Sequence, residues 1–249
     1  MIEWSTSDNI GILRLAHGKA SALDLEFLGA LENAFRDADK YDAVVVTGTG
    51  KIFSAGVDLF RLTNEGASYV DRFLPALDRA FLAILRYSRP VVAAVNGHAI
   101  AGGCLVALAC DRVLMVESGA KMGVPELRVG VPFPTLATGI LAAVVNPAIA
   151  RTLALTGATV EGSEAREMGL VDLTTTPEEL LARSIDVAKD LLQIPAATFA
   201  ATKRLRNEKL IRQAAEDDMT AKSAIHEIWR SPETHQTIRE YLAKTVGRK

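Results

Sequence analysis

Hydrophobic positions along this chain follow two patterns that alternate with each other. Short continuous runs of β-branched or small apolar residues predict buried strands. These runs cover 43–46, 91–95 and 112–116. Stretches with apolar residues three or four positions apart predict helices with one buried face. These stretches cover 24–38, 66–87, 102–109, 135–145 and 148–156. Strands that alternate with helices are typical of an α/β fold.

The two ends of the chain depart from this alternation. Residues 2–15 predict two short strands joined by a turn at Asp8-Asn9, and 171–173 is the last strand-like run. From residue 177 the pattern is helical, with a break at Pro195. Loosely recurring strand–strand–helix units favour a spiral over a doubly wound sheet. We therefore predict a core over 1–195 and a helical region over 196–249 that either caps the core or forms an oligomer interface.

Composition excludes several classes of protein. Of 249 residues, 49% are hydrophobic and 23% are charged, which is typical of a folded globular chain and not of a disordered one. The formal net charge is −2, so electrostatics give the chain no reason to bind nucleic acid or acidic membranes. Aromatic residues make up 6%, too few to favour a platform for stacking bases.

The two cysteines indicate a reducing compartment. Cys104 and Cys110 are six residues apart. On one helix their Cα atoms would be about 9 Å apart, too far for a disulfide. The first residues include Glu3 and Asp8 and lack a basic leader, unlike a secretory signal. We therefore expect a cytoplasmic protein.

One uncharged stretch, 91–110, is long enough to cross a bilayer. Asn96-Gly97 is a turn signal, and Gly102-Gly103 weaken a continuous helix. These residues favour a buried strand, a turn and a buried helix, so we predict no membrane partner.

Glycines at two places resemble phosphate-binding loops only in part. Gly48-Thr49-Gly50-Lys51 lacks the earlier glycine and the following Ser or Thr that the motif requires. The pair Gly97 and Gly102 is correctly spaced, but Gly103 stands where a lysine would hold the phosphates. The dinucleotide-binding fingerprint GxGxxG does not occur in the predicted strand-to-helix turns. We therefore expect neither nucleotide hydrolysis nor dinucleotide redox chemistry.

Two segments rich in small residues follow predicted strands, at 53–59 and 96–104. Ligand sites in α/β proteins lie at the carboxyl ends of strands, and small residues let a ligand approach the backbone. Two backbone N–H groups that converge there would form an oxyanion hole. The alternative is that these glycines serve only turns and tight packing.

Three motifs together resemble the crotonase superfamily (enoyl-CoA hydratase/isomerase). They are SAGVDL at 54–59, NGHAIAGGC at 96–104 and VPE at 124–126. The resemblance implies a crotonase-like spiral of ββα units and a C-terminal all-helical subdomain for trimerisation. It also implies a homotrimer, or a hexamer made of two trimers.

The resemblance assigns roles to individual residues. The backbone N–H groups of Ala55 and Gly102 match the positions that hold the thioester oxygen, and Glu126 matches a catalytic carboxylate. The implied substrate-binding residues are Lys19, Ala20, Ser54, Gly56, Val57, Asp58, Leu59, Gly103 and Leu105. Lys19 and Ala20 match the segment near the CoA adenine, and 54–59 matches the loop along the pantetheine arm. CoA is part of the substrate, so no separate cofactor and no metal are expected.

One position departs from the hydratase pattern. Family hydratases carry two glutamates, and here Leu105 stands at the first position while Glu126 occupies the second. Hydration needs a carboxylate to hold and deprotonate water, whereas moving a double bond needs only one base that carries a proton from C2 to C4. AGGCLVAL at 101–108 also resembles the mitochondrial-type Δ3,Δ2-enoyl-CoA isomerases of fatty acid β-oxidation.

The resemblance therefore predicts an isomerase that converts 3-enoyl-CoA to trans-2-enoyl-CoA. Three alternatives stay open: hydration of trans-2-enoyl-CoA, another crotonase reaction such as thioester hydrolysis or dehalogenation, and a protein that binds CoA esters without catalysis.

Other polar residues near these motifs have simpler interpretations. We expect Asp58 to cap a helix or fix its loop. His98 is predicted to lie in a loop or pocket wall, and Cys104 to be a small packing residue. Asp111 and Glu117 flank a predicted strand and are expected to face solvent or a turn.

Overall fold

The main sheet of the molecule has six strands in the order β1-β2-β3-β5-β7-β10. The computed structural model describes residues 1–216 and 219–245. The six strands are β1 (Ile2–Ser7), β2 (Ile10–Leu15), β3 (Ala43–Thr47), β5 (Val91–Val95), β7 (Arg112–Val116) and β10 (Leu173–Thr175). β1 and β2 are antiparallel, and the other neighbours pair in parallel. All residues of β3 and β5 are buried, which explains their continuous apolar runs.

The hairpin and the last strand lie close to their predicted places. Asp8 and Asn9 have φ of 48° and 63°, as a two-residue hairpin turn requires, and this confirms the predicted turn. The last strand begins at Leu173, two residues later than predicted.

A second sheet of four short strands was missed by the sequence pattern. It runs in the order β4 (Ile52–Ser54), β6 (His98–Ile100), β8 (Lys121–Gly123) and β9 (Thr159–Glu161). Each of β3, β5 and β7 in the main sheet is followed by one strand of this sheet and then by helix. This repeated unit forms the predicted spiral of ββα units.

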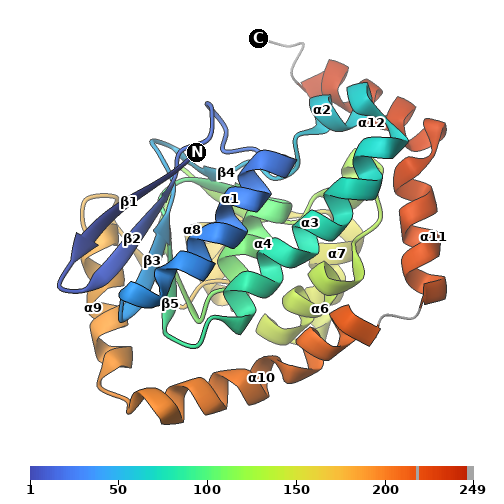
Figure 1. The fold of residues 1–249 in the computed structure, drawn as a ribbon. Helices are drawn as coiled ribbons and strands as arrows, with labels where there is room; N and C mark the ends of the chain where they lie inside the picture. The colour runs from blue at the N-terminus through green and yellow to red at the C-terminus, as the bar shows by residue number, and fades with distance from the viewer. Residues whose placement is uncertain (217–218, 246–249) are drawn as a thin grey trace.

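Helices cover the sheets and complete each unit (Figure 1). They are α1 (Leu25–Arg36), the 3-10 helix η1 (Asp37–Lys40), α2 (Leu59–Glu65), α3 (Ala67–Arg86), α4 (Gly102–Leu108), α5 (Glu126–Val129), α6 (Thr135–Val144), α7 (Pro147–Thr156), α8 (Gly162–Glu167), α9 (Leu180–Leu192), α10 (Ala196–Glu216), α11 (Met219–Arg230) and α12 (Pro232–Thr245). α1 packs against α3, and α9 packs against β3 and β5. Among the described helices, none combines the length and the apolar character that a membrane span requires.

The C-terminal helices wrap around the core of the same chain (Figure 1). α10 and α11 pack against α3, and α12 packs against α2 and α5. The predicted boundary at residue 195 stays a prediction, and its C-terminal region, 196–249, includes 217–218 and 246–249, which lie outside the described residues.

A buried ion pair fixes α10 to the core and corrects one prediction. Asp111 does not face solvent, because its carboxylate accepts a hydrogen bond from Lys203 Nζ at 2.6 Å and one from the Val91 N–H at 2.8 Å. The Lys203 side chain is 4% exposed. Burial raises the pKa of Asp111 and lowers that of Lys203, while their mutual attraction opposes both changes.

Candidate active site

The three candidate motifs meet because of the second sheet. β4 pairs in parallel with β6, and β6 pairs in parallel with β8. The carboxyl ends of parallel neighbours lie at the same edge of a sheet, which is where α/β proteins place ligands. Ala55 follows β4, Ala101 follows β6, and Val124 begins the segment after β8. The order of these short strands therefore gathers segments that are up to 70 residues apart in the sequence.

The first loop is held by hydrogen bonds to the segment around Leu23. Ser54 Oγ donates to the Ser21 carbonyl at 2.7 Å and accepts from the Gly56 N–H at 3.3 Å. Asp58 then accepts from the Arg61 N–H at 3.0 Å and caps α2, which confirms its predicted capping role. Leu59 begins α2 and is half-buried.

The Ala55 N–H is not free to bind a ligand. It donates to the Ala20 carbonyl at 3.0 Å, so the prediction that this group holds the thioester oxygen is wrong. Lys19, beside Ala20, is exposed on the same loop.

The free amide of this loop belongs to Val57, which the sequence reasoning placed only along the ligand. Val57 and Leu23 form a parallel bridge. The bridge uses the Gly56 carbonyl and the Asp58 N–H, both bonded to Leu23. Successive groups of an extended backbone point in opposite directions, so the Val57 N–H points away from Leu23. Within 1–216 and 219–245, no acceptor bonds to it.

Gly102 supplies a second free amide beside the first. It begins α4, and the first N–H groups of a helix have no partner inside the helix. No acceptor from the described part of the chain bonds to its N–H. A Cβ placed on Gly56 would lie 3.3 Å from the Gly102 nitrogen, so the two loops are in contact. Gly103 lies against the backbone of Ser54 and leaves no room for a side chain.

Ala101 sets the direction of the Gly102 amide. Its φ of 52° and ψ of −126° are unusual for a residue with a side chain. Its own N–H donates to the Gly123 carbonyl at 2.8 Å, which joins the turn to the end of β8.

Glu126 lies at the start of α5, three residues beyond Gly123. It is 6% exposed, and Oε2 has no hydrogen-bond partner among the described residues. Burial raises the pKa of the Glu126 carboxyl to about 7, and a hydrogen bond to its own backbone opposes the shift. Its charge adds to burial in raising the pKa of the Cys104 thiol, so Cys104 lies close to it on α4. The carboxyl is thus poised to gain and lose a proton near neutral pH.

The buried carboxyl gives a stability prediction. A carboxyl with a raised pKa stabilises the fold while it is protonated, and this stabilisation is lost as pH rises through about 7. We expect Glu126→Gln to match the wild type near pH 4 and to be more stable near pH 8.5 by about 3 kcal/mol. Urea unfolding at the two pH values measures this difference. If Glu126→Gln and the wild type had the same free energy of unfolding at both pH values, the carboxyl would not be buried as described.

Leu105 is the apolar residue at the sequence position where the resemblance places a hydratase glutamate. It lies on α4, directly after Cys104, and is 1% exposed. His98 is on β6 and not in a loop, and its Nδ1 accepts from the Lys121 N–H at 3.1 Å; the alternative that it lines a pocket wall stays a prediction. In the part of the chain that the structure describes, no three His, Cys, Asp or Glu side chains are grouped to hold a metal ion.

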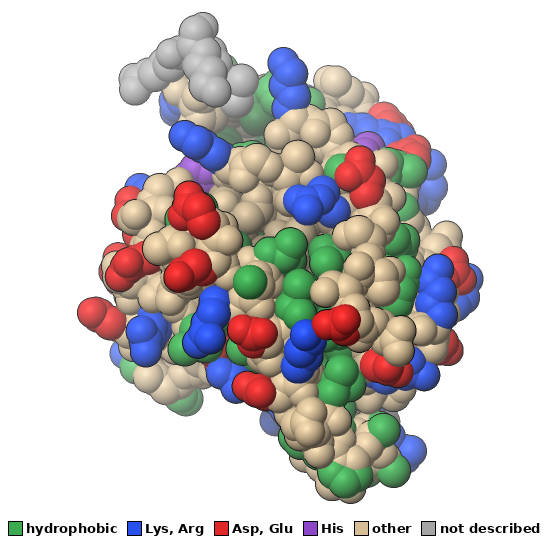
Figure 2. All heavy atoms as spheres, turned by 90° about the vertical axis from the view of Figure 1, so that its left-hand side faces the viewer, with side chains coloured by type: hydrophobic (Ala, Val, Ile, Leu, Met, Phe, Trp, Pro, Cys, Tyr) green, Lys and Arg blue, Asp and Glu red, His purple; other side chains and the backbone are tan. Residues whose placement is uncertain are grey.

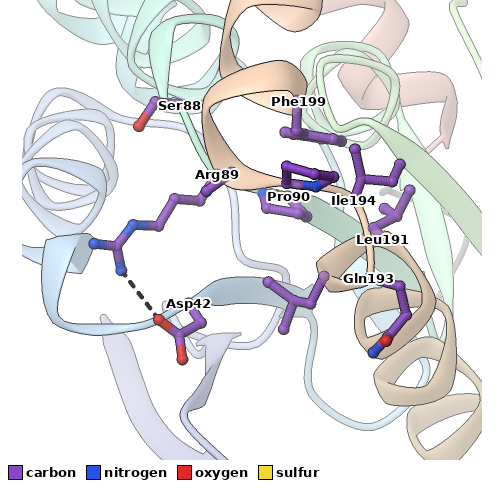
Figure 3. Close-up of a pocket in the computed structure, with 11 residues that line it drawn as sticks. Asp42, Ser88, Arg89, Pro90, Leu191, Gln193, Ile194 and Phe199 are labelled. Carbon is purple, nitrogen blue, oxygen red and sulfur yellow. Dashed lines mark ion pairs between the residues drawn. The ribbon is translucent and has the colours of Figure 1, made fainter.

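A pocket of about 460 Å³ lies at the opposite end of the main strands (Figure 3). Asp42 and Pro90 directly precede β3 and β5. Ile194, in the turn between α9 and α10, and Phe199, in the first turns of α10, form the other wall. Arg89 pairs with Asp42 at 3.7 Å across the rim. This pocket is therefore separate from the site of Glu126.

Comparison with known proteins shows the family of this chain. The family model described as enoyl-CoA hydratase/isomerase matches residues 6–246. The chain belongs to the enoyl-CoA hydratase/isomerase family. A putative enoyl-CoA hydratase from Thermus thermophilus is 39% identical over 184 residues, which cover 73% of this chain and 72% of the relative.

Solved structures of the same family share the fold. An enoyl-CoA isomerase of Mycobacterium tuberculosis is 25% identical, with a TM-score of 0.81 over 91% of this chain and 96% of that one. Human mitochondrial Δ3-Δ2-enoyl-CoA isomerase aligns with a TM-score of 0.95 at 20% identity, over 100% of this chain and 99% of that one. The chain is therefore an enzyme of the crotonase superfamily with the crotonase fold.

Proposed function

We propose that this enzyme converts 3-enoyl-CoA to trans-2-enoyl-CoA. The observation that carries the proposal is the buried carboxyl of Glu126, whose pKa is raised by burial. Leu105 stands at the position where the resemblance places the other acid of a hydratase, and it is a buried apolar residue on α4. Hydration would therefore need an acid from another position.

Glu126 is the proton-transfer group in this proposal. Its carboxylate removes the proton from C2 of the acyl chain, the electron pair moves to the thioester oxygen as a dienolate, and the protonated Glu126 returns the proton to C4. The C3–C4 double bond becomes C2–C3, and no water or co-reactant is consumed. A pKa of about 7 lets the same group act first as base and then as acid.

The free N–H groups of Val57 and Gly102 are proposed to hold the thioester oxygen. Negative charge develops on this oxygen in the dienolate, and fixed donors stabilise it without reorganisation. Gly102 also lies at the start of a helix, where partial positive charge is concentrated. The loop 54–59 and the segment of exposed Lys19 and half-buried Ala20 are proposed to contact the CoA part of the substrate.

Hydration of trans-2-enoyl-CoA is the second candidate, since the relative from Thermus thermophilus carries the description putative enoyl-CoA hydratase. Hydration requires a group that holds and deprotonates water, and the apolar Leu105 removes one acceptor from that position. A protein that binds CoA esters without turnover is the third.

Two assays on the purified enzyme distinguish these candidates. With 3-enoyl-CoA, we expect ultraviolet absorbance to rise as the conjugated 2-enoyl thioester forms. With trans-2-enoyl-CoA, we expect a much slower loss of the same absorbance by hydration. Fast hydration without isomerisation would overturn the proposal, and tight binding without turnover would favour the third candidate.

We also propose that the enzyme assembles as a homotrimer or as a hexamer of two trimers. Hydrophobic side chains gather between charged ones on the face that carries β1 and α9 (Figure 2). Large apolar residues are also exposed on the C-terminal helices, as at Leu205 and Ile228. Light scattering coupled to size-exclusion chromatography measures the mass of the assembly.

A further inference from the structure

We propose that Trp229 and Thr237, on the C-terminal helices of the same chain, are positioning residues for Glu126, a role that rests on the proposed function of Glu126. Neither residue lies in the three motifs that form the site. Both contact the short segment that follows α5, about 100 residues earlier in the sequence.

Trp229 is bonded directly to this segment. The indole N–H donates to the Pro132 carbonyl at 2.9 Å, and the side chain is 1% exposed. The Trp229 carbonyl in turn accepts a hydrogen bond from His235 Nε2 at 2.9 Å. This bond joins the end of α11 to the start of α12 and fixes the backbone that carries the indole.

Thr237 packs on the residue that ends α5. Gly130 has φ of 96°, a conformation that favours glycine, and caps the helix. A Cβ on Gly130 would lie 2.5 Å from the Thr237 methyl carbon, so that methyl group rests on the Gly130 backbone. The Thr237 hydroxyl is used elsewhere, because it donates to the Glu233 carbonyl at 3.0 Å within α12.

The contacted segment is bonded back to the backbone of Glu126. The Glu126 carbonyl accepts from the Gly130 N–H and from the Val131 N–H, both at 3.1 Å. Gly130 touches Thr237, and Val131 precedes Pro132, which bonds to Trp229. The Glu126 backbone is thus linked to the buried indole through two hydrogen bonds and the Val131-Pro132 backbone between them.

We expect this arrangement to limit the access of water to the Glu126 carboxyl. α5 is a single turn, too short to be stable without tertiary contacts, and it carries Glu126 as its first residue. When Trp229 or Thr237 no longer holds the end of this turn, we expect water to reach the carboxyl. Solvation favours the charged form, so the carboxyl then titrates at lower pH.

Three variants of the full-length enzyme test the proposal. Trp229→Phe removes the indole N–H and keeps most of the ring volume. Thr237→Ser removes the methyl group and keeps the hydroxyl bond to Glu233. Asn207→Ala is the matched control, because it removes a buried hydrogen bond between α10 and the Leu85 carbonyl, at 2.9 Å, without touching α5.

The readout is the titration of the Glu126 carboxyl in the absence of substrate. The infrared band of the protonated carboxyl is assigned by its loss in Glu126→Gln. We expect its midpoint to fall by about one pH unit in Trp229→Phe and by about half a unit in Thr237→Ser, and to stay in place in Asn207→Ala. The low-pH limb of kcat/KM is expected to move with it, with kcat roughly tenfold lower and KM unchanged.

The outcomes separate this proposal from the proposed function. An unchanged midpoint in Trp229→Phe and Thr237→Ser, or an equal shift in all three variants, overturns the positioning role. Because Thr237 is a surface residue, Thr237→Ser gives the result even where Trp229→Phe does not fold. Absence of turnover in the wild type would refute the isomerase proposal, while the titration without substrate would still report whether the C-terminal helices position Glu126.

Discussion

Replacing Glu126 by glutamine is expected to lower kcat for the conversion of 3-enoyl-CoA by about 10³- to 10⁴-fold. Glutamine has nearly the same shape and cannot accept the C2 proton. Among the described residues, no charged group shifts the pKa of the Glu126 carboxyl. KM is expected to change little, because the carboxyl acts on the reacting carbons and not on the CoA part.

Steady-state kinetics with 3-enoyl-CoA, together with calorimetric binding of a saturated acyl-CoA, measure both effects. Glu117→Gln is the control, since Glu117 is an exposed carboxylate outside the site. A Glu126→Gln enzyme that retains turnover within tenfold of the wild type would assign the proton transfer to another group.

The main sheet was predictable from the sequence, and the second sheet was not. β3 and β5 are buried on both faces, so each shows an unbroken apolar run. β4, β6, β8 and β9 have three residues each, too few to show an alternating pattern. Yet β4, β6 and β8 bring the three motifs together, so the motifs were visible in the sequence while their common site was not.

The prediction that the Ala55 N–H holds the thioester oxygen was wrong for a related reason. The motif SAGVDL identifies the loop but not the direction of each N–H. Ala55 and Val57 are both next to Gly56, and only the pairing with Ala20 and Leu23 decides which amide is occupied. A pairing partner more than 30 residues away leaves no mark in the local sequence.

The buried polar contacts could not be predicted either, because their partners are far apart in the sequence. The local sequence predicts only that Asp111 flanks a strand, because its partner Lys203 lies 92 residues later. The bond from Trp229 to Pro132 spans 97 residues. Helical periodicity predicted the C-terminal helices, but it does not specify which buried polar groups they satisfy.

The second large effect is expected from removing the N–H of Gly102. Gly102→Pro deletes this donor at the first position of a helix, where the missing N–H breaks no hydrogen bond inside the helix. Loss of one donor to a developing oxyanion costs about 10²- to 10³-fold in kcat. Gly102→Ala is the matched control, because it adds a Cβ at the same place and keeps the N–H.

Both variants place a Cβ 2.7 Å from Leu23 Cδ1, the end of a flexible side chain that has to shift in each of them. The steric cost of the Cβ is therefore shared, and the ratio of the two kcat values reports the replacement of the N–H by the proline ring. We expect Gly102→Ala to stay within tenfold of the wild type while Gly102→Pro falls about 100-fold further, with circular dichroism confirming the fold of each. Equal losses of kcat in the two variants would mean that the reaction needs space at Gly102 and not its N–H. The thioester oxygen would then have to be held by the Val57 N–H without a donor from Gly102.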